Sequence, residues 1–195
     1  MSMPKAFKTM ALALAGMVVV FFAVGLLLSD RWHVETVRTI RAPMAKVAEL
    51  VQDFGKWESW SSMKLEMGPG TQREISGTPG AVGHRIRWNA PHANAVLEVV
   101  AAGPQFLQYD FLLQVPPAPQ LTPSGHGTVR WEADGEGCRV TWSDDGTWDN
   151  LALRWVGWFG ALQEQVKQVQ GTSLAGLQRA IDDAAAGALS PDAKK

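Results

Sequence analysis

One long amphipathic pattern near the C-terminus, residues 149–185, constrains the fold more than any other part of the sequence. Apolar side chains recur there at spacings of three and four residues, with glutamine and charged side chains between them. Asp149 or Asn150 can act as the N-cap of this helix. A straight helix of this length would span about 55 Å, so we expect a bend near Gly171-Thr172. The apolar stripe requires a large surface to cover.

Composition narrows the class of protein to a folded chain with no expected role in nucleic-acid binding. Of 195 residues, 46% are hydrophobic, and the net charge is -1 without a cluster of lysine or arginine. Cys138 is the only cysteine, which excludes an intramolecular disulfide and favours a small core residue. Because no histidine pair or cysteine pair has metal-binding spacing, we expect no metal and no cofactor.

A run of 19 residues from Met10 to Leu28 carries no charged or strongly polar side chain. As a helix it would span about 28 Å, close to the roughly 30 Å hydrocarbon core of a bilayer. The alternative is a cleaved signal peptide, but Leu26-Leu27-Leu28 stands where its small residues should be. We therefore expect a single-pass membrane anchor at residues 10–29, after an N-terminal tail at residues 1–9. The lysines before the run favour an extracytoplasmic domain, whereas the arginines after it favour the opposite orientation.

Between the anchor and the last helix, the apolar pattern changes to the period of two that is typical of strands. The expected elements, in chain order, are a strand at 32–41, helical turns at 44–51 and 56–60, a weak strand at 71–76, and strands at 82–88, 93–101, 107–113, 127–134 and 138–146. The Asp134-Gly135-Glu136-Gly137 segment predicts a tight hairpin between the last two strands. Consecutive strands with hairpin links imply an antiparallel sheet, and the class is therefore α+β.

These residues resemble the START/Bet v1-like superfamily, also called SRPBCC, and within it bacterial proteins of the polyketide cyclase/dehydrase and lipid-transport type. The resemblance rests on the strand, Ala-Pro turn and WESW segment at 34–60, on Gly80-Ala-Val-Gly83 before Trp88, and on the Trp131 and Trp142 strands. It covers residues 32–186 and implies a helix-grip fold, in which the sheet wraps around the C-terminal helix. Because members of this superfamily share a cavity but no catalytic motif, no catalytic residue follows from it. The tail at 187–195 is polar and expected to be disordered.

An apolar gap between sheet and helix is where a hydrophobic ligand would bind. The expected lining residues are inward-facing strand residues and two aromatic residues of the helix: His84, Ile86, Trp88, Leu107, Tyr109, Phe111, Trp131, Trp142, Trp155 and Phe159. His84 could act as an acid or base, or could equally be a core histidine bonded to the backbone. Tyr109 could donate one hydrogen bond to a ligand, or simply pack. The helix before Gly171 is expected to form the cavity wall, and the alanine-rich part after it to pack in the core.

Three functions remain open from the sequence. The first is a membrane-anchored binding module for a lipid or another hydrophobic small molecule, which fits the absence of a catalytic constellation. The second is a cyclase/aromatase-like enzyme that acts on an apolar substrate through His84 or Tyr109. The third is a non-catalytic envelope protein whose cavity is vestigial.

Overall fold

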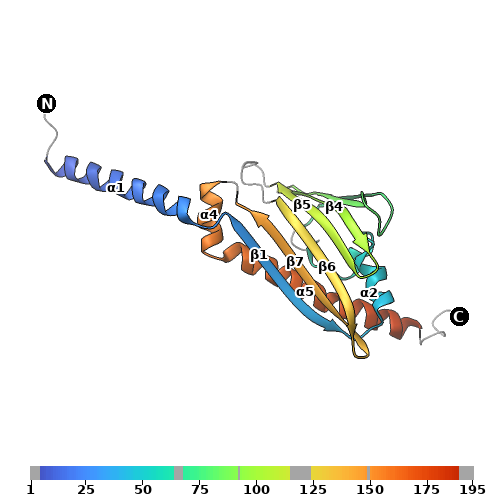
Figure 1. Cartoon of the computed structure of the whole chain (residues 1–195). Coiled ribbons are helices and arrows are strands. Elements are labelled where there is room, and N and C mark those ends of the chain that lie inside the picture. The colour runs from blue at the N-terminus through green and yellow to red at the C-terminus, as the bar shows by residue number, and fades with distance from the viewer. Residues whose placement is uncertain (1–4, 64–67, 92, 115–123, 149, 189–195) are drawn as a thin grey trace.

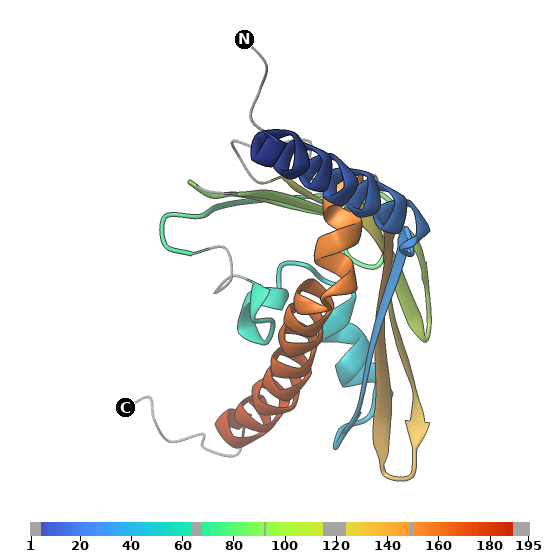
Figure 2. The same ribbon diagram turned by 90° about the vertical axis from the view of Figure 1, so that its left-hand side faces the viewer.

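A computed structural model of the chain describes residues 5–63, 68–91, 93–114, 124–148 and 150–188. Seven strands form one antiparallel sheet, which curves around a long C-terminal helix (Figures 1 and 2). The elements are α1 (Lys5–Leu27), β1 (Arg31–Ile40), α2 (Met44–Val51), the 3-10 turn η1 (Trp57–Ser59), β2 (Gln72–Ser76), β3 (Arg85–Asn89), β4 (Asn94–Gly103), β5 (Phe106–Gln114), β6 (Ser124–Asp134), β7 (Gly137–Thr147), α4 (Leu151–Trp158) and α5 (Ala161–Ala188). The expected α+β helix-grip architecture is confirmed. The tails expected at 1–9 and 187–195 lie partly outside the described residues.

The order of strands in the sheet is β1-β7-β6-β5-β4-β3-β2, so that the first strand pairs with the last. The β6–β7 hairpin turns at Gly135, whose φ of 61° suits glycine in a tight turn. Strand β1 alternates as expected, with Val34 and Ile40 buried and the intervening Glu35 and Thr39 exposed. The hairpin and the alternation were both predicted from the sequence.

The main core lies between the sheet and the second half of α5. Leu174 and Leu177 of α5 are fully buried in one cluster with the strand residues Val129, Val140 and Trp131. The WESW segment, which includes η1, covers this core from the side, and both of its tryptophans are buried. Trp57 donates its indole N–H to the carbonyl of Val51 at 2.8 Å, so its one polar atom is satisfied.

The C-terminal helical pattern breaks earlier than the sequence analysis predicts. The break lies at Phe159-Gly160, between α4 and α5, where Gly160 has a φ of 71°. Gly171, where we expected the bend, lies inside the continuous helix α5. The left-handed conformation at Gly160 ends α4 and turns the chain into α5, and glycine adopts it without steric cost. Asn150 is the N-cap of α4, and its side chain accepts from the N–H of Leu153 at 2.9 Å.

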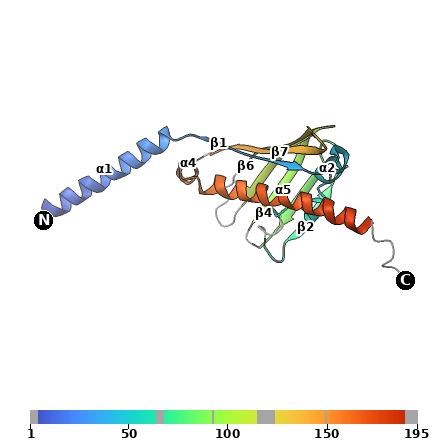
Figure 3. The same ribbon diagram turned by 90° about the horizontal axis from the view of Figure 1, so that it is seen from below.

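Helix α1 projects away from the sheet, and its main contact with the other described elements lies near its C-terminal end (Figures 1 and 3). There it packs against α4, where the Phe21 and Trp155 rings stack with centroids 4.9 Å apart. Its segment Thr9–Leu27 is long and apolar enough to cross a membrane, and almost none of it is buried against the domain.

Candidate functional site

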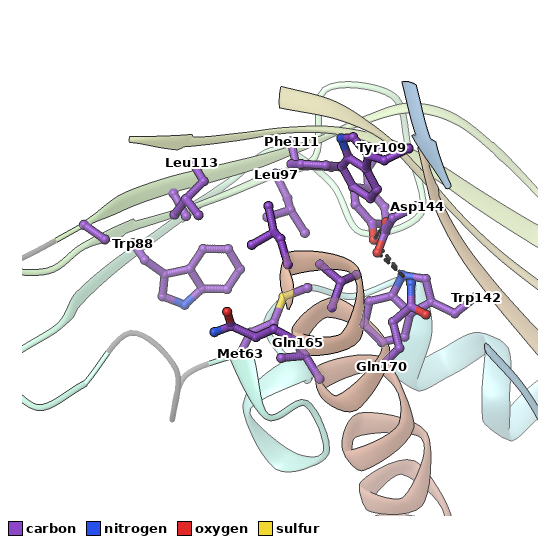
Figure 4. Close-up of a pocket in the computed structure, with 16 residues that line it drawn as sticks. Met63, Trp88, Leu97, Tyr109, Phe111, Leu113, Trp142, Asp144, Gln165 and Gln170 are labelled. Atoms are coloured by element: carbon purple, nitrogen blue, oxygen red, sulfur yellow. Dashed lines mark hydrogen bonds between the residues drawn. The ribbon is translucent and has the colours of Figure 1, made fainter. Parts of the chain in front are cut away.

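A cavity of about 310 Å³ lies between the sheet and the N-terminal part of α5 (Figure 4). Its walls come from β1, β3, β4, β5, β7, α5 and the segment after η1. The lining residues are Trp32, Met63, Trp88, Ala93, Ala95, Leu97, Tyr109, Phe111, Leu113, Trp142, Asp144, Leu162, Gln165, Val166, Val169 and Gln170. Most of these side chains are aliphatic or aromatic, and Asp144 is the only charged one among them.

Strand register places this cavity at the end of the sheet where β1 begins. Trp32, the second residue of β1, pairs with Gly146, and this row continues through β6 to Phe111 and then to Leu97. The next row toward the same end contains Leu113 and Ala95. Since β1 follows α1 directly, the cavity lies in the part of the sheet nearest to α1.

A buried polar cluster forms one side of the cavity and centres on Asp144, which is 6% exposed. Tyr109 donates its hydroxyl to Asp144 Oδ1 at 2.7 Å, and Gln170 donates its amide to Oδ2 at 2.8 Å. Behind them, Trp142 donates to the Tyr109 hydroxyl at 2.7 Å, and Thr36 donates to Gln170 Oε1 at 2.8 Å. Both branches of the network thus donate toward the carboxyl group of Asp144.

Gly127 makes room for this cluster. It pairs with both Tyr109 and Asp144 in the sheet, and a Cβ at this position would overlap the Tyr109 ring and Asp144 Oδ1. Glycine is therefore required for the tyrosine ring to reach the carboxyl group across β6.

Both acids of this cluster hold their protons more tightly than in water. Burial raises the pKa of the Asp144 carboxyl, although the hydrogen bonds from Tyr109, Gln170 and Trp142 act in the opposite direction. The pKa of the Tyr109 phenol lies well above its usual range, first because the group is buried and then because Asp144 is adjacent. The arrangement suits hydrogen bonding to a ligand.

Four of the ten residues expected from the sequence line this cavity: Trp88, Tyr109, Phe111 and Trp142. Figure 4 shows Trp88 at the apolar end beside Leu113, and Trp142 at the polar end beside Gln170.

His84 faces inward as expected but lies in the core away from the cavity lining. Its Nε2 accepts from the N–H of Phe54 at 3.0 Å, and its Nδ1 lies 3.1 Å from the carbonyl of Ser76. The ring also stacks on Phe54 with centroids 4.8 Å apart. Because both nitrogens are occupied by backbone groups, His84 is a satisfied core histidine, the second interpretation that the sequence allowed.

The other five expected residues also lie outside the lining. Ile86, Leu107 and Trp131 point inward, but they are buried in the main core, under α2, η1 and the second half of α5. Trp155 and Phe159 belong to α4 and its C-terminal end, which turn away from the sheet toward α1. Phe159 is 71% exposed.

Sequence reasoning did not identify Asp144 and Gln170, although a signal for each was present. Asp144 follows Val140 and Trp142 at the spacing of two that defines one face of a strand. Gln170 follows Val166 by four residues on the inward stripe of α5. Polar side chains in these positions look solvated in a sequence, because nothing in the sequence marks their partners.

Among the residues that the structure describes, no group of three His, Cys, Asp or Glu side chains could hold a metal ion. Cys138 is buried and reduced, and burial raises the pKa of its thiol, which makes it a poor nucleophile. One further buried donor, Trp32 Nε1 in the cavity wall, has no hydrogen-bond partner among the described residues.

Solved structures with a similar fold come from several sources. DynU16, a protein of the dynemicin biosynthetic locus, is 16% identical with a TM-score of 0.54, over 77% of this chain and 47% of its own. MLL2253 from Mesorhizobium loti is 19% identical with a TM-score of 0.54, over 78% of this chain and 98% of its own. TTHA0849 from Thermus thermophilus is 18% identical with a TM-score of 0.53, over 78% of this chain and 99% of its own. At these identities the likeness concerns the fold, and the chain spans about half the length of DynU16.

No curated protein matches the sequence. The sequence profile of the family described as "Polyketide cyclase / dehydrase and lipid transport" matches residues 31–182, which begin with β1 and end within α5. That range includes the sheet, the cavity and the polar cluster. The chain therefore belongs to the polyketide cyclase/dehydrase and lipid transport family.

Proposed function

We propose that the protein binds a hydrophobic small molecule or lipid in the cavity between the sheet and α5, and that α1 anchors it in a membrane. The observation that carries the proposal is the cavity itself, with walls that are mostly apolar apart from the cluster around Asp144. Its volume of about 310 Å³ falls at the lower end of the range of small-molecule pockets, about 300–1,000 Å³. Binding of an apolar ligand in a space of this size is favourable, because it removes the apolar surfaces of the ligand and the cavity from water.

The anchor rests on α1. Its apolar segment Thr9–Leu27 has a mean hydropathy of 2.7 and a length that matches the hydrocarbon core of a bilayer. The lysines at positions 5 and 8 favour a cytoplasmic N-terminus, which leaves the domain on the extracytoplasmic side.

The test is native mass spectrometry of the full chain after mild extraction, together with uptake of an environment-sensitive apolar dye. Wild-type protein should carry a co-purified ligand or take up the dye. Ala95→Phe, which places a ring in the cavity, should abolish both. The control is Val96→Phe, on the next residue of β4 but outside the cavity lining. The proposal is wrong if the wild type and Val96→Phe bind neither ligand nor dye. It is also wrong if Ala95→Phe binds them as the wild type does.

A second candidate is catalysis on an apolar substrate of the cyclase/aromatase kind. The observation in its favour is the Tyr109–Asp144 pair in the cavity wall, where a phenol and a carboxyl could exchange a proton with a bound substrate. His84 has no part in this version, because both its nitrogens bind backbone groups. Catalysis would be supported if the wild type converts an apolar carbonyl substrate and Tyr109→Phe does not. If every bound molecule is recovered unchanged, the protein binds its ligand without catalysis.

A further inference from the structure

We propose that Asp144 forms a subsite for the ammonium group of an amine, so that the ligand is a cationic amphiphile with its polar end at Asp144. This inference rests on the proposed function, because it names the chemical class of the ligand in the same cavity.

The hydrogen bonds around Asp144 all run toward it. Tyr109 and Gln170 each donate to one carboxyl oxygen, and their own acceptor atoms already receive bonds from Trp142 and Thr36. An ionised carboxylate offers about four acceptor positions, and Tyr109, Gln170 and Trp142 take up to three of them, so at least about one stays free for a ligand. These donors stabilise a negative charge on Asp144, whereas burial without a countercharge disfavours it.

That charge has no opposite charge nearby. Among the described residues, no Lys, Arg or His side chain lines the cavity, and no ion pair of Asp144 is found. A buried carboxylate without a countercharge is costly, and an ammonium group on the ligand would supply one. An anionic ligand such as a fatty acid would instead place a second negative charge beside Asp144, where no cation separates the two.

The shape of the cavity also suits an amphiphile. Figure 4 shows the polar cluster at one end and Trp88 and Leu113 at the other. Aromatic rings of Trp142, Tyr109 and Phe111 lie in the walls, and faces of this kind attract an organic cation in addition to the carboxylate.

The experiment compares three probes with the same ring system: 1-naphthalenemethylamine, 1-naphthalenemethanol and 1-naphthoic acid. Each is titrated calorimetrically at neutral pH into the full chain in lipid nanodiscs, and the heat with empty nanodiscs is subtracted. Wild-type protein should bind the amine at least about tenfold more tightly than the alcohol, as expected for a charge-assisted hydrogen bond, and the acid most weakly.

Asp144→Asn should remove the preference for the amine and leave alcohol binding within about twofold. This variant is nearly isosteric, and a half-turn of the Gln170 amide would restore complementary bonds. The matched control is Asp145→Asn, on the exposed neighbour that points to the other face of β7, which should keep the preference. Asp144→Ser, which also removes the carboxyl group, should lose the preference as well, and provides a second measurement if Asp144→Asn does not fold.

The outcomes distinguish failure of the amine subsite from failure of the proposed function. If none of the three probes binds, the proposed function itself is wrong. If all three bind the wild type equally, or if the preference for the amine survives in Asp144→Asn, the cavity remains a hydrophobic site and the amine subsite is wrong.

A different observation, the contact between α1 and α4, carries a second inference. We infer that α4 lies in the lipid–water interface, with the adjacent side chains of Trp158 and Phe159 against the bilayer. These two are 63% and 71% exposed, although they are large and apolar. Helix α4 is held to α1 by the Phe21–Trp155 stack and by Gly25, which lies directly against Trp155 and Leu151.

The depth of this contact fits an interfacial helix. Phe21 lies six residues before the end of α1, which corresponds to about 9 Å along the helix axis. Interfacial helices bury their apolar faces about 5–10 Å into the boundary between headgroups and acyl chains, and tryptophan is enriched at that level. The bilayer is therefore the occupant that matches the exposed aromatic pair, provided that α1 spans the membrane.

The test uses single-cysteine variants of the full chain, in a Cys138→Ala background, labelled with a fluorophore that brominated lipids quench. Trp158→Cys should be quenched by bromine placed near the headgroups. Val82→Cys, on a 70% exposed residue between β2 and β3, should not be quenched.

Met17→Cys, in the middle of α1, reports on the anchor alone. If the label at this position is not quenched by deep bromine, α1 does not span the bilayer and the anchor in the proposed function is wrong. If it is quenched by deep bromine and the label at position 158 stays in water, only the inference about α4 is wrong. Efficient disulfide formation between two Trp158→Cys chains would also overturn it, because a second copy would then occupy this surface.

Discussion

Gly127 lies beneath the Tyr109 ring, whereas Gly171 has open space around it. Replacing each glycine by alanine should therefore change the free energy of unfolding in opposite directions. Gly127→Ala places a methyl group against the Tyr109 ring and Asp144, so the ring or the carboxyl group must move. We expect the free energy of unfolding to fall by about 1–3 kcal/mol. Gly171→Ala, inside α5 with nothing within 4 Å of the added carbon, should raise it by about 0.5–1 kcal/mol.

Chemical denaturation of both variants, followed by far-UV circular dichroism, measures this difference. A Gly127→Ala variant as stable as the wild type would mean that the tyrosine–carboxyl pair is loosely held. The network proposed to orient a ligand would then lose its structural basis.

The ionisation of Asp144 should appear as a pH dependence of stability. Burial raises the pKa of its carboxyl in the folded protein, whereas the unfolded chain titrates near the usual pKa of about 3.9. The folded protein therefore binds more protons than the unfolded chain between these two values, and its stability falls as the pH rises from about 4 through the folded pKa. Asp144→Asn cannot ionise, so the stability of the variant relative to the wild type should rise over the same interval.

The measurement is the difference in unfolding temperature between the two ligand-free proteins across that pH range, with Asp145→Asn as the control. A difference that does not change with pH, or that changes in the opposite direction, would contradict the raised pKa.

At the scale of residues, the sequence indicates the faces of the strands but not the role of polar side chains on them. Alternation in the sequence predicts inward positions for both His84, which lies just before β3, and Asp144, which lies in β7. The structure satisfies His84 with two backbone groups and places Asp144 in the cavity wall. This difference depends on Phe54, Ser76 and Gln170, which lie 30, 8 and 26 residues from their partners in the sequence, so alternation alone could not predict it.

At the scale of elements, Gly25 sets how closely α1 and α4 approach. A Cβ at Gly25 would lie 2.7 Å from Trp155 Nε1 and 2.8 Å from Leu151 Cδ1. Gly25→Val should therefore separate the two helices and remove the stack of Phe21 on Trp155. We expect α4 to loosen while the sheet stays intact.

Hydrogen exchange of the full chain in nanodiscs measures this effect. Protection of the α4 amides should fall in Gly25→Val and stay unchanged in Gly16→Val, because a Cβ at Gly16 meets nothing within 4 Å. Equal protection in the two variants would show that the contact between α1 and α4 does not hold α4 in place.

The position of the break in the C-terminal helix could not be predicted from the local apolar pattern. Both Gly160 and Gly171 interrupt the apolar stripe, and Gly171 lies nearer to the middle of the pattern. The structure breaks at Gly160 because α4 must turn away from the sheet to meet α1, while the helix around Gly171 continues over the core. The choice between the two glycines depends on tertiary contacts that the periodicity does not contain.

At the scale of the whole molecule, the architecture could be predicted, whereas the cavity could be predicted only in part. Alternation and the hairpin at Gly135 specify an antiparallel sheet with one inward face, and a single long helix is available to cover it. The position of the helix along that face determines which inward residues stay uncovered. Leu107 and Tyr109 share a face two residues apart, yet Leu107 is in the core alone and Tyr109 also lines the cavity.

The connection between α1 and β1 is three residues long, since α1 ends at Leu27 and β1 begins at Arg31. Fully extended, such a tether reaches about 10 Å, and the Ser29 hydroxyl shortens it further through its bonds to Arg31. With α1 in a bilayer, the domain can only rock on the surface of that membrane and cannot reach another one. The domain then moves in two dimensions only, and any ligand dissolved in the adjacent leaflet is held at a high effective concentration beside it. Under the proposed function, the protein would therefore collect or present its ligand at its own membrane, and onward transfer would require a second carrier to come to it.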